Sequence, residues 1–136
     1  MLFTYDSIKE EVRERREGFR DYYYNFFDIF EEFYNPELVK CVYIKNIFNS
    51  NKNETIFFFD NKVVSVTKKD IHFTIEENRS KIIDKVIYVS EHSSRQINLE
   101  LTFDNGEKIV FDNYKDSNES CAGEYGLDIK ELYKLI

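Results

Sequence analysis

The chain has 136 residues, of which 42% are hydrophobic and 17% aromatic, with 13 Phe and 10 Tyr but no Trp. This length suits one domain with its own core, and the composition is too apolar for a disordered chain. A formal net charge of −7 argues against non-specific binding to nucleic acid or to an anionic membrane, because both require a basic surface.

The compartment is inferred from the N-terminus and the cysteines. The opening MLFTYDSIKEE becomes charged too early for a signal peptide, and no apolar run approaches the ~20 residues that span a bilayer. Cys41 and Cys121 lie far apart and outside any Cys-x-x-Cys pattern, so we expect reduced thiols rather than a disulfide framework or a zinc site. A cytoplasmic single domain spanning 1–136 is expected. The abundance of Lys, Asn, Ile, Phe and Tyr suits an AT-rich bacterial or phage genome.

Residues 7–34 are predicted to form one long helix. Ser7 with Glu10 three residues later is the reciprocal capping pattern of a helix start. Apolar residues then recur at spacings of three and four, which lays a stripe along one face, and Asn35-Pro36 ends the pattern. We expect this striped face to be buried.

The second half of that helix, DYYYNFFDIFEEFY, is aromatic on nearly all sides. One core cannot cover both faces of such a helix, so its outer face either contacts a partner or is covered by its own domain, under a loop or against its own sheet. Half-exposed tyrosines are a third alternative, since normal surfaces keep much apolar area. For the first alternative the partner is another protein or a second copy in a homodimer, and the predicted anchors are Tyr22, Tyr24, Phe27 and Tyr34.

From residue 38 to 113 the apolar period changes to two, which predicts a sheet or barrel. The connections are too short for parallel crossovers, so we expect an antiparallel meander. The predicted strands lie at 38–48, 54–60, 62–68, 70–76, 82–90, 96–103 and 107–112.

The last connection, in LTFDNGEKIVF, is predicted to be a corner and not a site. A three-residue loop at Asp104-Asn105-Gly106 sets Leu101 opposite Ile109 and so places the large apolar groups on one face. Gly106 is expected in the left-handed conformation, which only glycine adopts without steric cost.

The chain closes with a polar loop at 113–126 and a predicted helix at 127–136, capped by Asp128. Apolar residues fall at helical spacing to the chain end, so this helix is expected to dock on the sheet. The fold class is therefore α+β.

The segments VVSVTKKDIHFTI, KIIDKVIYVS, INLELTFDNGEKIVFDN and LDIKELYKLI, within 62–136, resemble the later strands and closing helix of bacterial pleckstrin-homology-like barrels. That resemblance implies a binding or scaffolding module for phospholipid head groups, peptides or proteins. A cystatin-like fold, in which a curved sheet wraps an N-terminal helix, is the alternative and makes better use of the long helix.

The resemblance also implies an alternative site for an anionic ligand or lipid head group, because lipid-binding members of that fold gather basic residues near the first hairpin loops. The candidate residues here are Lys45, Lys52, Lys62 and Lys69. Peripheral lipid binding is the one membrane role that this allows.

Signals for enzyme chemistry are sparse. Cys121, in ESCAGEYG, could act only with His72 or His92, and a cysteine-dependent enzyme is kept as a remote alternative. No histidine stands at metal-ligand spacing from the helix carboxylates, and no Gly-rich phosphate loop is present. We therefore predict no catalytic residues, no metal and no cofactor, and a protein-interaction or scaffolding role instead of an enzyme.

Overall fold

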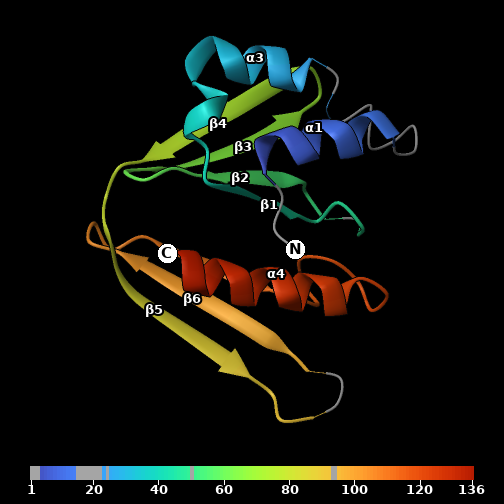
Figure 1. The fold of residues 1–136 in the computed structure, drawn as a ribbon, viewed down its shortest axis with the longest axis vertical. Helices are drawn as coiled ribbons and strands as arrows, with labels where there is room; N and C mark the ends of the chain where they lie inside the picture. The colour runs from blue at the N-terminus through green and yellow to red at the C-terminus, as the bar shows by residue number, and fades with distance from the viewer. Residues whose placement is uncertain (1–3, 15–22, 24, 50, 93–94) are drawn as a thin grey trace.

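The computed structural model describes residues 4–14, 23, 25–49, 51–92 and 95–136 (Figure 1). Its helices are α1 (Tyr5–Glu14), α3 (Phe26–Phe33), the short 3-10 helix η1 (Pro36–Leu38) and α4 (Ala122–Leu135). Its strands are β1 (Cys41–Lys45), β2 (Glu54–Phe58), β3 (Val63–Lys69), β4 (His72–Asn78), β5 (Ile82–Val89), β6 (Ile97–Phe103) and β7 (Lys108–Asp112). The α+β class and the strands predicted from the sequence are confirmed.

The strands form two antiparallel sheets in which neighbours in space are neighbours in sequence. Sheet A has the order β1-β2-β3-β4, and sheet B has the order β5-β6-β7. Among the described residues no strand pairing joins the two sheets, so the predicted barrel is not closed, and the single curved sheet of the cystatin-like alternative is not present either. The short β4–β5 connection does not form a hairpin because its polar groups bond to the β6–β7 turn: Asn78 Nδ2 donates to Glu107 Oε2 (2.9 Å), and Asp104 N donates to Lys81 O (2.8 Å).

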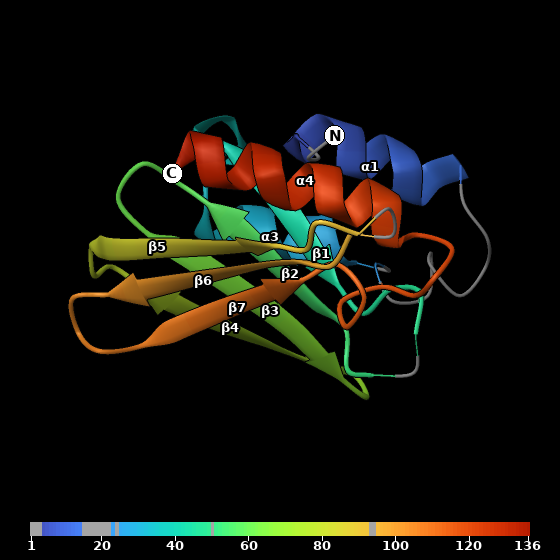
Figure 2. The same cartoon turned by 90° about the horizontal axis from the view of Figure 1, so that it is seen from below.

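Sheet A is the central layer of the molecule. Helices α1 and α3 cover one of its faces, and sheet B together with α4 covers the other (Figures 1 and 2). Successive side chains along the strands of sheet A point to opposite faces, so each strand contributes to the hydrophobic core on both sides of the sheet. Cys41 and Tyr43 of β1 face sheet B, whereas Val42 and Ile44 face the helices. This explains why β1 and β2 of the central sheet carry nearly continuous apolar runs, as strands buried on both faces do.

The predicted single helix at 7–34 is wrong. Asn25, directly before α3, has a left-handed backbone (φ 59°, ψ 1°), which a continuous right-handed helix does not allow. Asparagine tolerates this conformation better than most residues. Two short helices can both pack on sheet A, whereas a straight helix of 28 residues would be about 42 Å long and would overhang the sheet.

The start of the first helix also differs from the prediction. Thr4 N donates to Ser7 Oγ (2.8 Å) and Ser7 N donates to Thr4 Oγ1 (3.1 Å), so the reciprocal cap is formed by Thr4 and Ser7. Ser7 therefore occupies the third helical position and not the cap, and α1 begins at Tyr5.

The DNG corner is confirmed in conformation and register. Gly106 has φ 89°, and Leu101 pairs with Ile109 as Leu99 pairs with Phe111. Leu99, Leu101 and Phe111 are fully buried, so the apolar face set the register, as expected.

The closing helix begins five residues earlier than predicted. Cys121 N donates to Asn118 Oδ1 (2.9 Å) where the helix starts, and Tyr125 in its first turn donates to Ile44 O (2.6 Å). This anchor buries the first turn beneath β1, which offsets the low helix propensity of Gly123 and Gly126. Docking of α4 on the sheets through Ile129 and Leu132 is confirmed.

Candidate functional site

Of the four aromatic residues predicted to form an interface, the structure describes two, Phe27 and Tyr34. Tyr22 and Tyr24 lie outside the described residues. Phe27 is half-buried, stacks on Tyr23 at 5.7 Å between ring centroids, and meets Tyr5 edge-on at 5.7 Å. Phe27 therefore contributes to the packing between α1 and α3, with part of its ring exposed.

Tyr34, the fourth predicted anchor, is also half-buried. Its ring stacks on Phe30 (5.1 Å), and its hydroxyl donates to Glu77 Oε1 (3.0 Å). Burial, followed by the hydrogen bond to Glu77, raises the pKa of Tyr34 to about 12. The large apolar side chain of α3 that is exposed is Phe33, at 66%, and it was not among the predicted anchors.

The four lysines predicted to bind an anion are not gathered at one place. Lys45, Lys52 and Lys69 lie toward one end of sheet A, whereas Lys62 is in the β2–β3 turn at the opposite end. Lys45 is already engaged, because its ammonium donates to Val110 O, lies 3.8 Å from Asp116 Oδ1 and sits over the Phe111 ring. As a set, these lysines do not form one pocket.

The cysteines do not show a catalytic arrangement. Cys121 is half-buried at the start of α4, and among the described residues no hydrogen bond links it to His72 on β4 or to His92 after β5. Cys41 is buried, and burial raises the pKa of its thiol to about 11. Within the described part of the chain, no group of three or more acidic, histidine or cysteine side chains is placed to hold a metal ion.

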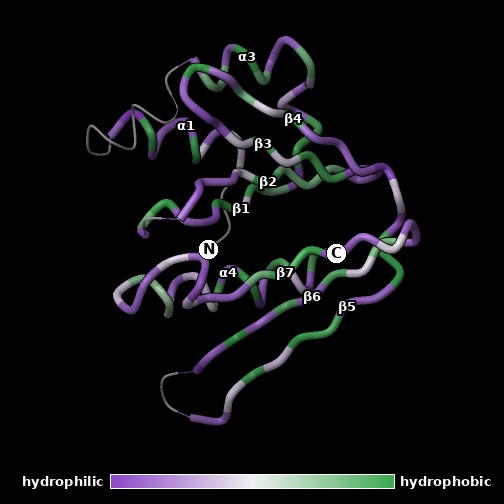
Figure 3. Tube along the Cα trace, turned by 180° about the vertical axis from the view of Figure 1, so that it is seen from behind, coloured by the Kyte–Doolittle hydropathy of each residue, from purple (hydrophilic) through white to green (hydrophobic). Residues whose placement is uncertain are grey.

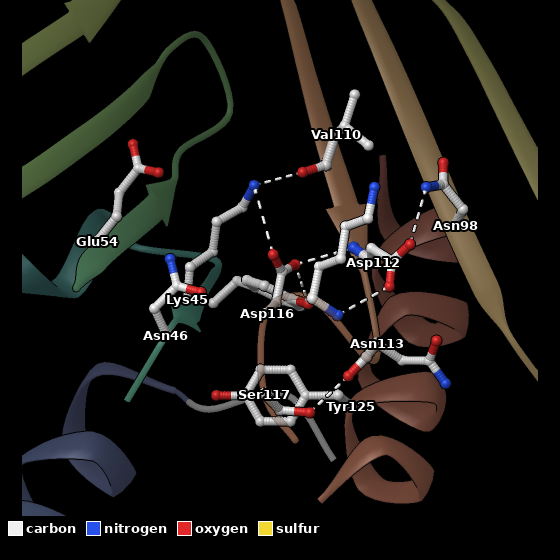
Figure 4. A network of polar contacts seen from close by, with 12 residues as sticks. Lys45, Asn46, Glu54, Asn98, Val110, Asp112, Asn113, Asp116, Ser117 and Tyr125 are labelled. Carbon is white, nitrogen blue, oxygen red and sulfur yellow. Dashed lines mark hydrogen bonds and ion pairs between the residues drawn. The ribbon is translucent and has the colours of Figure 1, made fainter. Parts of the chain in front are cut away.

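The densest polar cluster joins β1 to the loop after β7 (Figure 4). Asp116 is its centre: one carboxylate oxygen accepts from Tyr43 Oη (2.8 Å) and from Asp112 N (2.9 Å), and the other lies near Lys45. Burial raises the pKa of Asp116, although Lys45 and the two hydrogen bonds oppose that shift.

Asp112 has the opposite shift. Burial disfavours its charged form, but hydrogen bonds from the Lys115 amide, Gln96 and Asn98 outweigh burial and lower its pKa. Both carboxylates are thus saturated by groups of the protein itself. The cluster fixes the loop after β7 against sheet A, and we assign it a structural role.

A different kind of surface lies on β5, an edge strand of sheet B (Figure 3). This strand has eight residues and pairs on one side only, with β6. Four of its large apolar side chains are exposed: Ile83 (63%), Val86 (36%), Tyr88 (61%) and Val89 (47%). Such an edge is a template for pairing with another strand.

The usual protections of an edge strand are weak on β5. Its one cation, Lys85, turns away from the edge and donates to the carbonyls of Tyr133 (2.7 Å) and Ile136 (3.0 Å) at the end of α4. A bulge between Ile82 and Asp84 affects only the start of the strand, and β5 contains no proline. The stretch from Asp84 to Val89 therefore presents a regular, unpaired edge.

Comparison with known proteins places the chain in a family. Residues 4–125 match the sequence model of a protein family, DUF3908, which is described as a protein of unknown function. The chain belongs to the DUF3908 family. No curated protein and no solved structure matches it.

The DUF3908 match contains both β5 and the Asp112–Asp116 cluster, as well as all seven strands. Within the described residues of this DUF3908 chain, none of the helices combines the length and apolar character that crossing a membrane requires. The sequence interpretation missed both features. Asp116 stood in the segment 113–126 taken as a polar loop, Asp112 was the last residue of the predicted strand 107–112, and β5 showed the same alternation as the paired strands.

Proposed function

We propose that this chain is a protein-interaction module that binds an extended polypeptide strand along the free edge of β5. The observation that carries the proposal is the exposure of Ile83, Val86, Tyr88 and Val89 on one edge strand, which pairs with β6 on one side only. Strand addition supplies affinity through main-chain hydrogen bonds and specificity through alternate side chains.

The occupant that fits this edge is β5 of a second copy. If a two-fold axis passes through Val86, antiparallel pairing sets Val86 opposite itself and Asp84 opposite Tyr88 of the other copy. All three side chains lie on the outer face of sheet B, since they pair with Thr102, Glu100 and Asn98 of β6. Each pair then joins apolar groups or a carboxylate and a phenol, both favourable across strands. Two three-stranded sheets would become one six-stranded sheet.

The first test is molar mass in solution by light scattering after size exclusion, over a wide concentration range. We expect a dimer of twice the monomer mass for the native chain. Val86→Lys sets two like charges opposite each other and should give monomer at concentrations where the native chain is dimeric. Leu127→Lys, at a residue of α4 that is 56% exposed, is the matched control and should leave the dimer intact.

The register is tested by cross-linking. Opposed residues of an antiparallel pair have Cα atoms ~4.5–5.5 Å apart, within the range that a disulfide spans. In a Cys121→Ser background, Val86→Cys should form a covalent dimer under mild oxidation, whereas Leu127→Cys should not. A native chain that is monomeric at all concentrations, or a dimer unaffected by Val86→Lys, contradicts self-pairing through β5.

A pleckstrin-homology-like architecture and a cytoplasmic location belong to the same proposal. Two sheets of four and three strands followed by an amphipathic helix support the architecture, and the two free thiols support the location. Phe27 and Tyr34 remain proposed as a second contact surface, because both keep part of their rings exposed.

A further inference from the structure

A pocket of about 560 Å³ lies between the two sheets at the end where α4 stops. Its walls come from the β2–β3 turn, the β4–β5 connection and the last residues of α4, which lie side by side in Figures 1 and 2. This volume falls within the ~300–1,000 Å³ typical of small-molecule sites. The pocket touches β5 at Ile82, the first residue of the strand, but its lining includes none of the exposed residues Ile83, Val86, Tyr88 and Val89 of the proposed pairing edge.

The floor of this pocket is apolar. Phe58, Val63 and Phe103 line it from the core between the sheets, where each is at least nine-tenths buried. Leu135 lines it from α4 and is 48% exposed. An apolar ligand body entering here would extend the existing core and would be removed from water.

The rim of the pocket is basic, although the chain as a whole is acidic. Four cationic side chains line it: Lys40, Lys62, Arg79 and Lys81. One acidic side chain, Asp60, also lines the pocket and lies 3.5 Å from the Lys40 ammonium, and Ile136, whose main-chain carboxylate ends the 136-residue chain, lines it as well.

The rim cations differ in how far they are already engaged. The Arg79 guanidinium is paired with Glu77 on β4, and Lys62 lies over the Phe59 ring at 5.0 Å. No described residue forms a hydrogen bond or ion pair with the Lys81 ammonium, which is exposed. Positive charge therefore remains at the mouth of an apolar pocket.

We propose that this pocket binds a single-chain carboxylic amphiphile, with its acyl chain among Phe58, Phe103 and Leu135 and its carboxylate at the Arg79–Lys81 rim. Arginine suits the head group because its planar fork of donors matches a carboxylate. The site lies at the opposite end of sheet A from Lys52 and Lys69, which the sequence had suggested for an anion.

The test is an NMR titration of the ¹⁵N-labelled full chain with decanoate below its micelle concentration. Saturable shifts are expected for the amides of residues 79–82 and 135–136. Decyltrimethylammonium has the same chain but the opposite head charge, and it should not produce them. Shifts that map to another surface, or a response that does not saturate, overturn the proposal.

Matched double variants separate the loss of positive charge at the rim from a general effect of net charge. Arg79→Gln with Lys81→Gln should weaken decanoate binding by about tenfold, the scale of two partly exposed ion pairs. Lys52→Gln with Lys69→Gln removes the same charge at the far end of sheet A and should leave the affinity within about twofold. Equal weakening by both double variants overturns the site.

A substitution in the apolar wall of the pocket provides a second test of the proposal. Leu135→Asp removes an apolar contact and adds a negative charge at the pocket, so it should also weaken decanoate binding. Circular dichroism and the midpoint of thermal unfolding check that each variant is folded. Undiminished binding by folded Leu135→Asp contradicts the placement of the acyl chain.

Discussion

Gly106 and Gly123 illustrate how backbone conformation decides the effect of one methyl group. Gly106 has φ 89°, where an L side chain is strained, although nothing lies within 4 Å of an added Cβ. We expect Gly106→Ala to lower the free energy of unfolding by about 1 kcal/mol. Gly123 lies in α4, also with nothing within 4 Å of an added Cβ, so Gly123→Ala should be neutral or stabilising. Urea denaturation measures both, and a loss of stability in both variants would contradict a purely conformational cause.

Asp128 predicts a pH dependence of stability. Burial, reinforced by Glu131 and Glu124, raises the pKa of its carboxyl from 3.8 to about 6. Between these values the folded state binds more protons than the unfolded state, so this group's contribution to stability is lost as the pH rises from about 4 to about 6.

Asp128→Asn removes that contribution to the pH dependence. The free energy of unfolding of the variant minus that of the native chain should rise by about 1–2 kcal/mol from pH 4 to pH 7, after allowance for partial solvent screening. Denaturation series at four or five pH values measure this difference. Parallel curves for the two proteins would show that Asp128 has an ordinary pKa.

Residue-level chemistry could be predicted where it is local. The register of the DNG hairpin followed from Leu101, Ile109 and the conformational freedom of Gly106. The role of Asp116 could not be predicted, because its hydrogen-bond partner Tyr43 lies 73 residues away along the chain. Whether the Asp116 carboxylate finds hydrogen-bond donors depends on how the two sheets dock, and no sequence pattern near Asp116 predicts that docking.

At the scale of elements, α3 offers a matched pair of aromatic residues. Phe27 packs between Tyr5 and Tyr23, whereas Phe33 on the same helix is 66% exposed. We expect Phe27→Glu to lower the free energy of unfolding by about 2 kcal/mol or more, because a charge replaces a ring in an apolar contact. Phe33→Glu should change it by less than about 0.5 kcal/mol.

Chemical denaturation with light scattering of the same samples distinguishes the two roles of Phe27. Lost stability assigns Phe27 to the packing of α1 and α3. A fully stable Phe27→Glu chain with altered molar mass would instead assign it to an interface between chains.

Element types were easier to predict than their ends. The strands followed from alternation, but the long helix was interrupted at Asn25, whose left-handed backbone leaves the apolar spacing unchanged. The start of α4 was missed because the local sequence favours a helix less than the structure does. Gly123 and Gly126 lower helix propensity, yet the hydrogen bond from Tyr125 to Ile44 O holds that turn in place.

At the scale of the whole molecule, short connections correctly predicted antiparallel neighbours but not the division into two sheets. The link Arg79-Ser80-Lys81 is as short as a hairpin loop, but the Lys81 carbonyl and the neighbouring Asn78 side chain form hydrogen bonds with the β6–β7 turn, and β5 does not pair with β4. The exposed edge of β5 and the pocket beside Lys81 both result from that departure. Neither candidate site could therefore be predicted before the sheets were placed.

The agreement between sequence order and spatial order in both sheets also has a kinetic consequence. Each ladder joins strands adjacent in sequence, so closing it costs little chain entropy, and each sheet can form from local hairpins. The contacts that span the longest stretch of chain, such as Tyr125 with Ile44, are made by α4. In a chain synthesised from the N-terminus, both sheets can leave the ribosome before the helix that holds them together.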